Sequence, residues 1–98
     1  LSKVTALEAA DARVNVTCNA VCPGYVWTPL VENQIPDTMK EYDMDRDTVI
    51  REIMLARQPS KEFATTQQIG GTVAFLCSDA AAQITGTTIS VDGGWTAL

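Results

Sequence analysis

The chain has 98 residues, of which 46% are hydrophobic and 19% charged, a composition ordinary for a single globular domain. Its net charge of −5 argues against nucleic acid or an anionic membrane surface as a partner, because both attract clustered Lys and Arg. No apolar run approaches the roughly 20 residues that a membrane helix needs, and the first residues do not resemble a secretory signal.

The cysteine and histidine content excludes several kinds of site. Cys18, Cys22 and Cys77 suit no disulfide framework, so we expect reduced thiols, buried as small apolar side chains, in a cytoplasmic protein. The chain has no histidine, which removes the commonest metal ligand and the commonest general base. The sequence therefore predicts no metal site, no Ser-His-Asp triad and no Cys-His dyad.

The first predicted elements are a helix and a strand. Apolar residues at helical spacing predict a helix from Leu1 to about Ala10, with no capping residue before it. Alternating apolar and polar positions, rich in β-branched residues, predict a strand over Arg13–Cys22. The Pro23-Gly24 pair ends this strand, because proline cannot donate to a ladder and glycine favours a turn.

Two or three helices are predicted next. Thr28-Pro29 can cap and begin a short helix within Tyr25–Ile35, whereas we expect the polar stretch Pro36–Asp43 to be mobile. Asp45 or Asp47 can cap a second helix that has apolar residues along one side.

The last helix and strand have clearer signals. Thr65-x-x-Gln68 is a capping box and begins a helix that runs to Cys77. Because Gly70-Gly71 weakens that helix, we expect close packing against a neighbour there. Thr85-Gly86 turns the chain into a strand over Thr87–Val91.

The order helix, strand, two or three helices, strand predicts an α/β fold with two parallel strands joined by a right-handed crossover. Parallel strands are normally buried on both faces of a wider sheet, so the Arg13–Cys22 strand would expose an unpaired edge. The sequence therefore predicts part of a doubly wound sheet.

The stretch from Asn19 to Leu30 places a turn at the carboxyl end of a parallel strand, where open α/β sheets bind ligands. Gly24 would let a flat ring approach the main chain, and free N–H and C=O groups around Val26 could pair with a carboxamide. The Thr28 hydroxyl could reach an amide or a phosphate. The plainer interpretation is a strand-to-helix turn with a helix cap at Thr28.

A second motif near the end of the chain consists of Ile84-Thr85-Gly86 and Val91-Asp92-Gly93-Gly94. Together with Asn19-x-x-x-Pro23-Gly24-x-x-x-Thr28, it resembles the C-terminal portion of the short-chain dehydrogenase/reductase family, over essentially all 98 residues. The resemblance implies an NAD(P)-dependent oxidoreductase with a Rossmann-type doubly wound fold, usually a tetramer. It also implies that the nicotinamide end of the cofactor is held by Pro23, Gly24, Val26, Thr28 and Leu30.

Within the family, the chain is most similar to the 3-hydroxybutyrate dehydrogenases, at Val4–Glu8, Thr17–Gly24, Thr28–Val31, Gln58–Ser60, Phe75–Ser78 and Val91–Trp95. This similarity implies NAD as cofactor and a small hydroxy or keto acid as substrate, namely 3-hydroxybutyrate and acetoacetate. It implies that Gln34 holds the substrate carboxylate and that Tyr25 and Trp95 wall the methyl end. These enzymes more usually have Trp at the position of Tyr25, so the substrate itself stays open.

Several of these side chains have plainer interpretations. Gln34 on a polar helix could simply be solvated, and Trp95 near a C-terminus could be an interface or core aromatic. We expect Trp27 to pack and Asp92 to stabilise its own turn.

The residues that carry out proton transfer in the family are missing. The family uses a Tyr with a Lys four residues later, whereas Tyr25 and Tyr42 precede Pro29 and Arg46 at that spacing. The Gly-rich phosphate turn is also absent. We therefore expect no catalytic residue here, and expect residues 1–98 to be the C-terminal fragment of a single short-chain dehydrogenase domain. Alone, it would be inactive, would bind NAD weakly or not at all, and would self-associate.

Two alternatives stay open. The chain could be a non-catalytic, self-associating module from a truncated gene. It could also belong to another short-chain reductase that acts on 3-oxoacyl carriers or sugars, although Gln34 and Trp95 argue against that.

Overall fold

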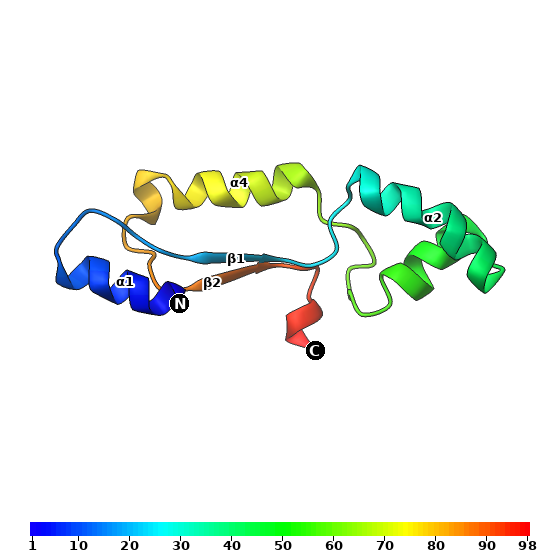
Figure 1. Cartoon of the computed structure of the whole chain (residues 1–98), viewed down its shortest axis with the longest axis horizontal. Helices are drawn as coiled ribbons and strands as arrows, with labels where there is room; N and C mark the ends of the chain where they lie inside the picture. Colours follow the sequence, from blue (N-terminus) through cyan, green and yellow to red (C-terminus); the bar gives the residue numbers. More distant parts are fainter.

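The structure, a computed structural model, describes all 98 residues and contains a two-stranded parallel sheet with helices around it (Figure 1). Strand β1 (Ala20–Pro23) pairs with β2 (Thr88–Val91), so that the Ala20 Cα lies opposite Thr88 and the Pro23 Cα opposite Val91. The predicted α/β fold with two parallel strands is confirmed.

The helices surround the sheet unevenly. Helix α4 (Thr66–Leu76) runs along one face of the sheet, and α1 (Ser2–Asp11) lies on the opposite side (Figure 1). Helix α2 (Pro29–Tyr42) returns through α3 (Arg46–Thr48) and the π-helical turn η1 (Val49–Met54), which extend beyond the carboxyl ends of the strands (Figure 1). Two short 3₁₀ turns, η2 (Asp79–Ala81) and η3 (Trp95–Ala97), complete the chain.

The molecule is elongated, and little of it is buried. Its extents are 57 × 24 × 19 Å and its radius of gyration is 17.6 Å, against about 13 Å for a compact domain of this size. Only nine residues are buried, and the larger ones, Ile35, Val49, Leu55 and Gln58, lie in α2, η1 and the loop after it. The sheet therefore has no continuous core of its own. None of the helices has the length and apolar character needed to cross a bilayer.

Three helix caps form as predicted. The Val31 N–H donates to the Thr28 hydroxyl at 3.3 Å, at the start of α2. The Asp45 carboxylate accepts from the backbone N–H and the hydroxyl of Thr48. Thr65 and Gln68 form the complete capping box of α4. Each cap satisfies backbone donors that a helix leaves free at its first turn.

Two predicted boundaries are wrong. The first strand is confined to Ala20–Pro23, because residues 13–19 have no strand beside them and Arg13 turns the chain with a φ of 56°. The stretch Pro36–Asp43 is ordered as the second half of α2, apart from its last residue. The helix continues through Pro36, a residue that normally interrupts a helix. The fully buried Ile35 before it and the helix-favouring Met39, Lys40 and Glu41 after it stabilise this continuation.

Two predictions about packing are also wrong. A Cβ placed on Gly70 or Gly71 would meet no atom within 4 Å, so no close neighbour in the chain explains the glycine pair. Cys22 and Cys77 are exposed and only Cys18 is half-buried, because little packs against the outer side of β1 or the end of α4.

The exposed apolar surface leads us to propose that the chain self-associates. Large apolar side chains are exposed on α1, on α4 and in the segment before β1, among them Val4, Leu7, Val14, Val16 and Phe75. Burial of exposed apolar surface against a second chain lowers the free energy of the assembly. We expect sedimentation velocity at micromolar concentration to show dimers or larger species that dissociate on dilution; a monomer throughout this range would contradict the proposal.

Candidate functional site

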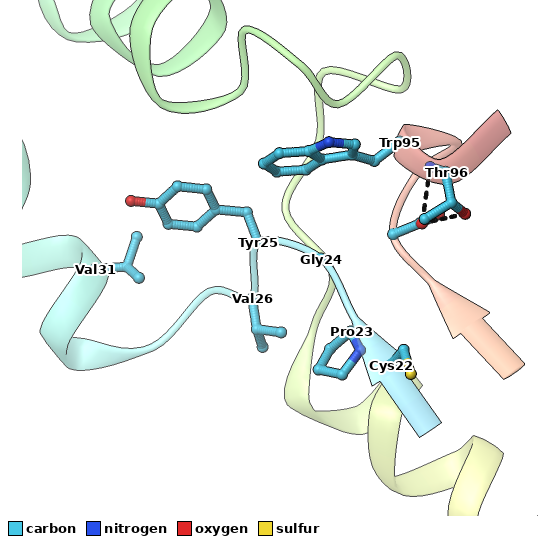
Figure 2. Close-up of a pocket in the computed structure, with 9 residues that line it drawn as sticks. Cys22, Pro23, Gly24, Tyr25, Val26, Val31, Trp95 and Thr96 are labelled. Carbon is cyan, nitrogen blue, oxygen red and sulfur yellow. Dashed lines mark hydrogen bonds between the residues drawn. The ribbon is translucent and has the colours of Figure 1, made fainter. Parts of the chain in front are cut away.

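The carboxyl ends of β1 and β2 open into a pocket of about 570 Å³ (Figure 2). Its walls come from the end of β1 and the residues after it, from the start of α2, and from the turn after β2: Cys22, Pro23, Gly24, Tyr25, Val26, Val31, Asp92, Trp95 and Thr96. Most of the residues that the sequence singled out are therefore brought together, at the edge of the sheet where α/β folds bind ligands.

Three predicted site residues lie outside this pocket. The Thr28 hydroxyl caps α2, and Thr28 lines a separate hollow of about 310 Å³ between the first turns of α2 and α4. The Leu30 side chain is 69% exposed. Gln34 is exposed on α2, one helical turn beyond Val31, so it lies next to the pocket along that helix without lining it.

The backbone of Val26 offers an unpaired donor and acceptor at the pocket. The Ala64 N–H donates to the Tyr25 carbonyl at 3.0 Å, and the Trp27 N–H donates to the Ala64 carbonyl at 2.8 Å. Because neighbouring peptide groups of an extended chain point to opposite sides, the N–H and C=O of Val26 face away from Ala64. Neither makes a hydrogen bond in the structure, so this pair is free for a ligand.

Gly24 is required by the protein's own packing. Its N–H donates to the Val91 carbonyl at 3.0 Å and continues the β1–β2 ladder past Pro23. A Cβ at this position would lie 2.6 Å from the Gln58 Oε1 and 2.8 Å from the Asp92 Cα. The close approach predicted here is therefore to Gln58 and Asp92; approach of a flat ring is not needed to explain the glycine.

Gln58 lies next to the pocket, and nothing in the sequence indicated a role for it. Its side chain is fully buried, its Oε1 accepts from the Tyr25 N–H at 3.0 Å, and its Nε2 donates to the Glu62 carbonyl at 2.6 Å. The only signal in the sequence was its place in Gln58-Pro59-Ser60, a segment that resembles the 3-hydroxybutyrate dehydrogenases, and that resemblance gave it no function.

The aromatic side chains are held by neighbours from other segments. Phe63 packs edge-on to Tyr25, with ring centroids 5.4 Å apart, and lies 5.2 Å from the Trp27 ring, so the predicted packing role of Trp27 is confirmed. In the view of Figure 2, the Tyr25 ring and the Trp95 indole both lie above the Gly24 backbone. Aromatic pairs of this geometry stabilise a fixed ring orientation.

Asp92 fixes the turn that carries Trp95, as predicted. Its carboxylate accepts from the Thr96 hydroxyl at 2.8 Å and from the Thr96 N–H at 3.1 Å (Figure 2). It also accepts from the Gly94 N–H at 3.1 Å. The Thr96 hydroxyl, followed by these backbone donors, lowers the pKa of the Asp92 carboxyl below its ordinary value of 3.8. No group of three or more His, Cys, Asp or Glu side chains is placed to hold a metal ion.

Comparison with known proteins gives the family. A family model described as Enoyl-(Acyl carrier protein) reductase matches residues 1–96. The chain belongs to the short-chain dehydrogenase/reductase family. It is 52% identical to the D-beta-hydroxybutyrate dehydrogenase of Rhizobium meliloti, over 99% of this chain and 37% of that protein. The corresponding enzyme of Cupriavidus necator is 43% identical, over 98% of this chain and 36% of that protein.

Solved structures of the family confirm the predicted Rossmann-type fold. A short chain dehydrogenase family protein from Francisella tularensis matches with a TM-score of 0.81 and 33% identity, over 99% of this chain and 39% of that one. A 4-hydroxyisoleucine dehydrogenase complexed with NADH matches with a TM-score of 0.75 and 28% identity, over 99% of this chain and 35% of that one. The chain thus spans little more than a third of the length of these short-chain dehydrogenases.

The contacts of Gly24 lead to a stability prediction. We expect Gly24→Ala to lower the free energy of unfolding by about 1–3 kcal/mol, because the new methyl group overlaps the Asp92 backbone. Gly70→Ala is the matched control: its methyl group meets open space within α4, and we expect a gain of about 0.5–1 kcal/mol. Urea denaturation followed by circular dichroism measures both, and equal stability of the two variants would contradict the packing argument.

The Asp92 pKa gives a pH prediction. Because the folded pKa lies below 3.8, ionised Asp92 stabilises the Trp95 turn fully above pH 3.8, and this contribution is lost as the pH falls through the folded value. We expect Trp95 fluorescence, measured in a Trp27→Phe background, to change with a midpoint below pH 3.8. Thr96→Val should move that midpoint upward, since it removes the largest cause of the shift; an unchanged midpoint would contradict the assignment.

Proposed function

We propose that these residues form the nicotinamide-side and substrate-side walls of an oxidoreductase that converts 3-hydroxybutyrate to acetoacetate with NAD. The observation that carries the proposal is the pocket at the strand ends, which is lined by the aromatic residues Tyr25 and Trp95 and by Val26, whose N–H and C=O are unpaired. The extensive identity with D-beta-hydroxybutyrate dehydrogenases supports this choice among the reactions of the family.

The residues present fit the nicotinamide end of a dinucleotide. The free N–H and C=O of Val26 match the acceptor and donor of a carboxamide, and Pro23 and Gly24 form the adjoining wall. Bound here, the nicotinamide ring would accept the hydride that leaves the carbinol carbon of the substrate. Thr28 and Leu30, at the start of α2, would contact the cofactor beyond the ring.

The substrate side of the proposal uses Tyr25, Trp95 and Gln34. Tyr25 and Trp95 supply flat apolar surface for the methyl end of a small acid, and both line the pocket. Gln34 would donate its side-chain amide to the carboxylate. It lies one turn along α2 from Val31, so this contact needs α2 to bring that turn toward the pocket.

The 98 residues contain no Tyr-x-x-x-Lys pair, so proton transfer from the substrate hydroxyl cannot use that pair from within them. We therefore propose that the chain by itself oxidises no 3-hydroxybutyrate and binds NAD weakly or not at all. A measurable activity therefore requires the chain to stand within a complete enzyme of the same family.

A chimaera tests the proposed function. The 97 matching residues of the Rhizobium meliloti D-beta-hydroxybutyrate dehydrogenase are replaced by those of this chain. We expect NAD-dependent oxidation of D-3-hydroxybutyrate with a kcat/KM within about tenfold of that of the recipient enzyme, because a tenfold loss corresponds to only about 1.4 kcal/mol of transition-state stabilisation. The 98-residue chain alone, in the same assay, should give no turnover.

Gln34→Glu in the chimaera tests the substrate assignment. A negative charge facing the substrate carboxylate should raise the KM for 3-hydroxybutyrate by about tenfold or more, with little change in the KM for NAD. Asn33→Asp, which adds the same charge at the neighbouring exposed position of α2, is the matched control and should change neither. A chimaera that prefers 3-oxoacyl thioesters or sugars, or equal effects of the two substitutions, would overturn the substrate assignment. A folded chimaera without dehydrogenase activity would favour a non-catalytic module.

A further inference from the structure

The most completely buried polar side chain of the molecule belongs to Gln58, which is 1% exposed. Gln58 does not line the pocket; it lies behind the wall, between the segment that follows β1 and the turn that follows β2. A buried side-chain amide that makes no hydrogen bond is unfavourable. The hydrogen-bond partners of Gln58 therefore indicate which backbone segments it holds in place.

On one side, Gln58 completes the anchoring of the backbone around Val26. Its Oε1 accepts from the Tyr25 N–H at 3.0 Å. Ala64 then holds the Tyr25 carbonyl and the Trp27 N–H, at 3.0 and 2.8 Å. Every backbone group from the Tyr25 N–H to the Trp27 N–H is thereby fixed by the protein, except the N–H and C=O of Val26, a residue that lines the pocket.

On the other side, the same residue contacts the turn that leads to Trp95. A Cβ on Gly93 would lie 2.7 Å from the Gln58 Cγ and 2.2 Å from the Ser60 Oγ, and the Ser60 N–H donates to the Gly93 carbonyl at 3.0 Å. The Gln58 Nε2 donates to the Glu62 carbonyl at 2.6 Å, which ties this contact to the loop that carries Phe63 and Ala64.

We propose that Gln58 is a positioning residue. Its side-chain amide fixes the Tyr25–Val26 backbone relative to the Gly93 turn. As a result, the backbone N–H and C=O of Val26 and the side chains of Tyr25 and Trp95 face the same pocket. The inference rests on the proposed function for what the pocket binds, but the hydrogen bonds that carry it are independent of that function. The competing role is that Gln58 only fills the space between Gly24 and Gly93.

Amide hydrogen exchange on the full 98-residue chain tests the positioning role without any cofactor. Gln58→Met keeps the volume and removes both side-chain hydrogen bonds. We expect the Tyr25 N–H to exchange about tenfold faster or more, because it loses its only partner, while the N–H groups of β1 keep their protection. Gln83→Met, at an exposed glutamine without a side-chain hydrogen bond, is the matched control and should change neither. Unchanged exchange at Tyr25 in Gln58→Met would overturn the proposal.

A second variant covers the case in which Gln58→Met does not fold. Gln58→Glu keeps an acceptor for the Tyr25 N–H and loses only the donor to the Glu62 carbonyl. Under the positioning role, the Tyr25 N–H stays protected in Gln58→Glu while exchange rises around Glu62. Fast exchange at Tyr25 in this variant, with β1 still protected, would contradict the proposed hydrogen bond.

The chimaera described above separates this inference from the proposed function. It is assayed with NAD and with the 3-acetylpyridine analogue, which lacks the carboxamide N–H that would donate to the Val26 carbonyl. We expect the preference for NAD in kcat/KM to shrink by about tenfold in Gln58→Met, as one aligned hydrogen bond is lost, and to persist in Gln83→Met. Equal losses with both cofactors would show a space-filling role and overturn the inference. An unsubstituted chimaera without activity would instead contradict the proposed function and leave the exchange test to decide on Gln58.

Discussion

The backbones of Gly24 and Asp92 meet so closely at the carboxyl ends of the two strands that no side chain fits between them. A Cβ on Gly24 would lie 2.8 Å from the Asp92 Cα, and the Gly24 N–H still donates to Val91 across the ladder. Beyond this contact the two segments must diverge, since Tyr25 leads toward α2 and Gly93 leads toward Trp95. The pocket is the space that their divergence opens, so its position is set by this contact at the ends of the two strands.

The pocket walls depend on polar anchors because the chain has little core to hold them. Only nine of the 98 residues are buried, and two of these, Gln58 and Asp92, are polar residues directly behind the pocket or in its wall. Apolar packing is tolerant of small shifts, whereas a hydrogen bond fixes the direction of a backbone group. Gln58 directs the Tyr25 peptide and Asp92 directs the Thr96 peptide, so each wall has one buried side chain that sets its orientation.

Apart from the pairing of β1 with β2, which follows from the order of the elements, the sequence predicted features whose partners are close along the chain. The Thr28 cap, the Thr65–Gln68 capping box and the Asp92 turn each join residues no more than four positions apart, and each formed as expected. The Val26–Ala64 bridge and the Tyr25–Gln58 hydrogen bond join residues more than thirty positions apart, so nothing in local spacing indicated them. The prediction of a mobile stretch at Pro36–Asp43 was wrong because it considered only the polar composition of that segment. The burial of Ile35, just before it, could not be read from that composition.

The single loop from Gln58 to Ala64 contacts both walls of the pocket. Gln58 and Ala64 hold the backbone on either side of Val26, while Phe63 holds the Tyr25 ring edge-on and Ser60 holds the Gly93 carbonyl. The position of residue 25 is thus fixed through its backbone and through the contact of its ring with Phe63, while Tyr25 lines the pocket. Under the proposed function, the Tyr25 hydroxyl would therefore change the chemistry of the pocket wall without requiring the wall to move. Under that proposal, substrate preference would change with the side chain at residue 25 while the backbone groups of Val26 stay in place.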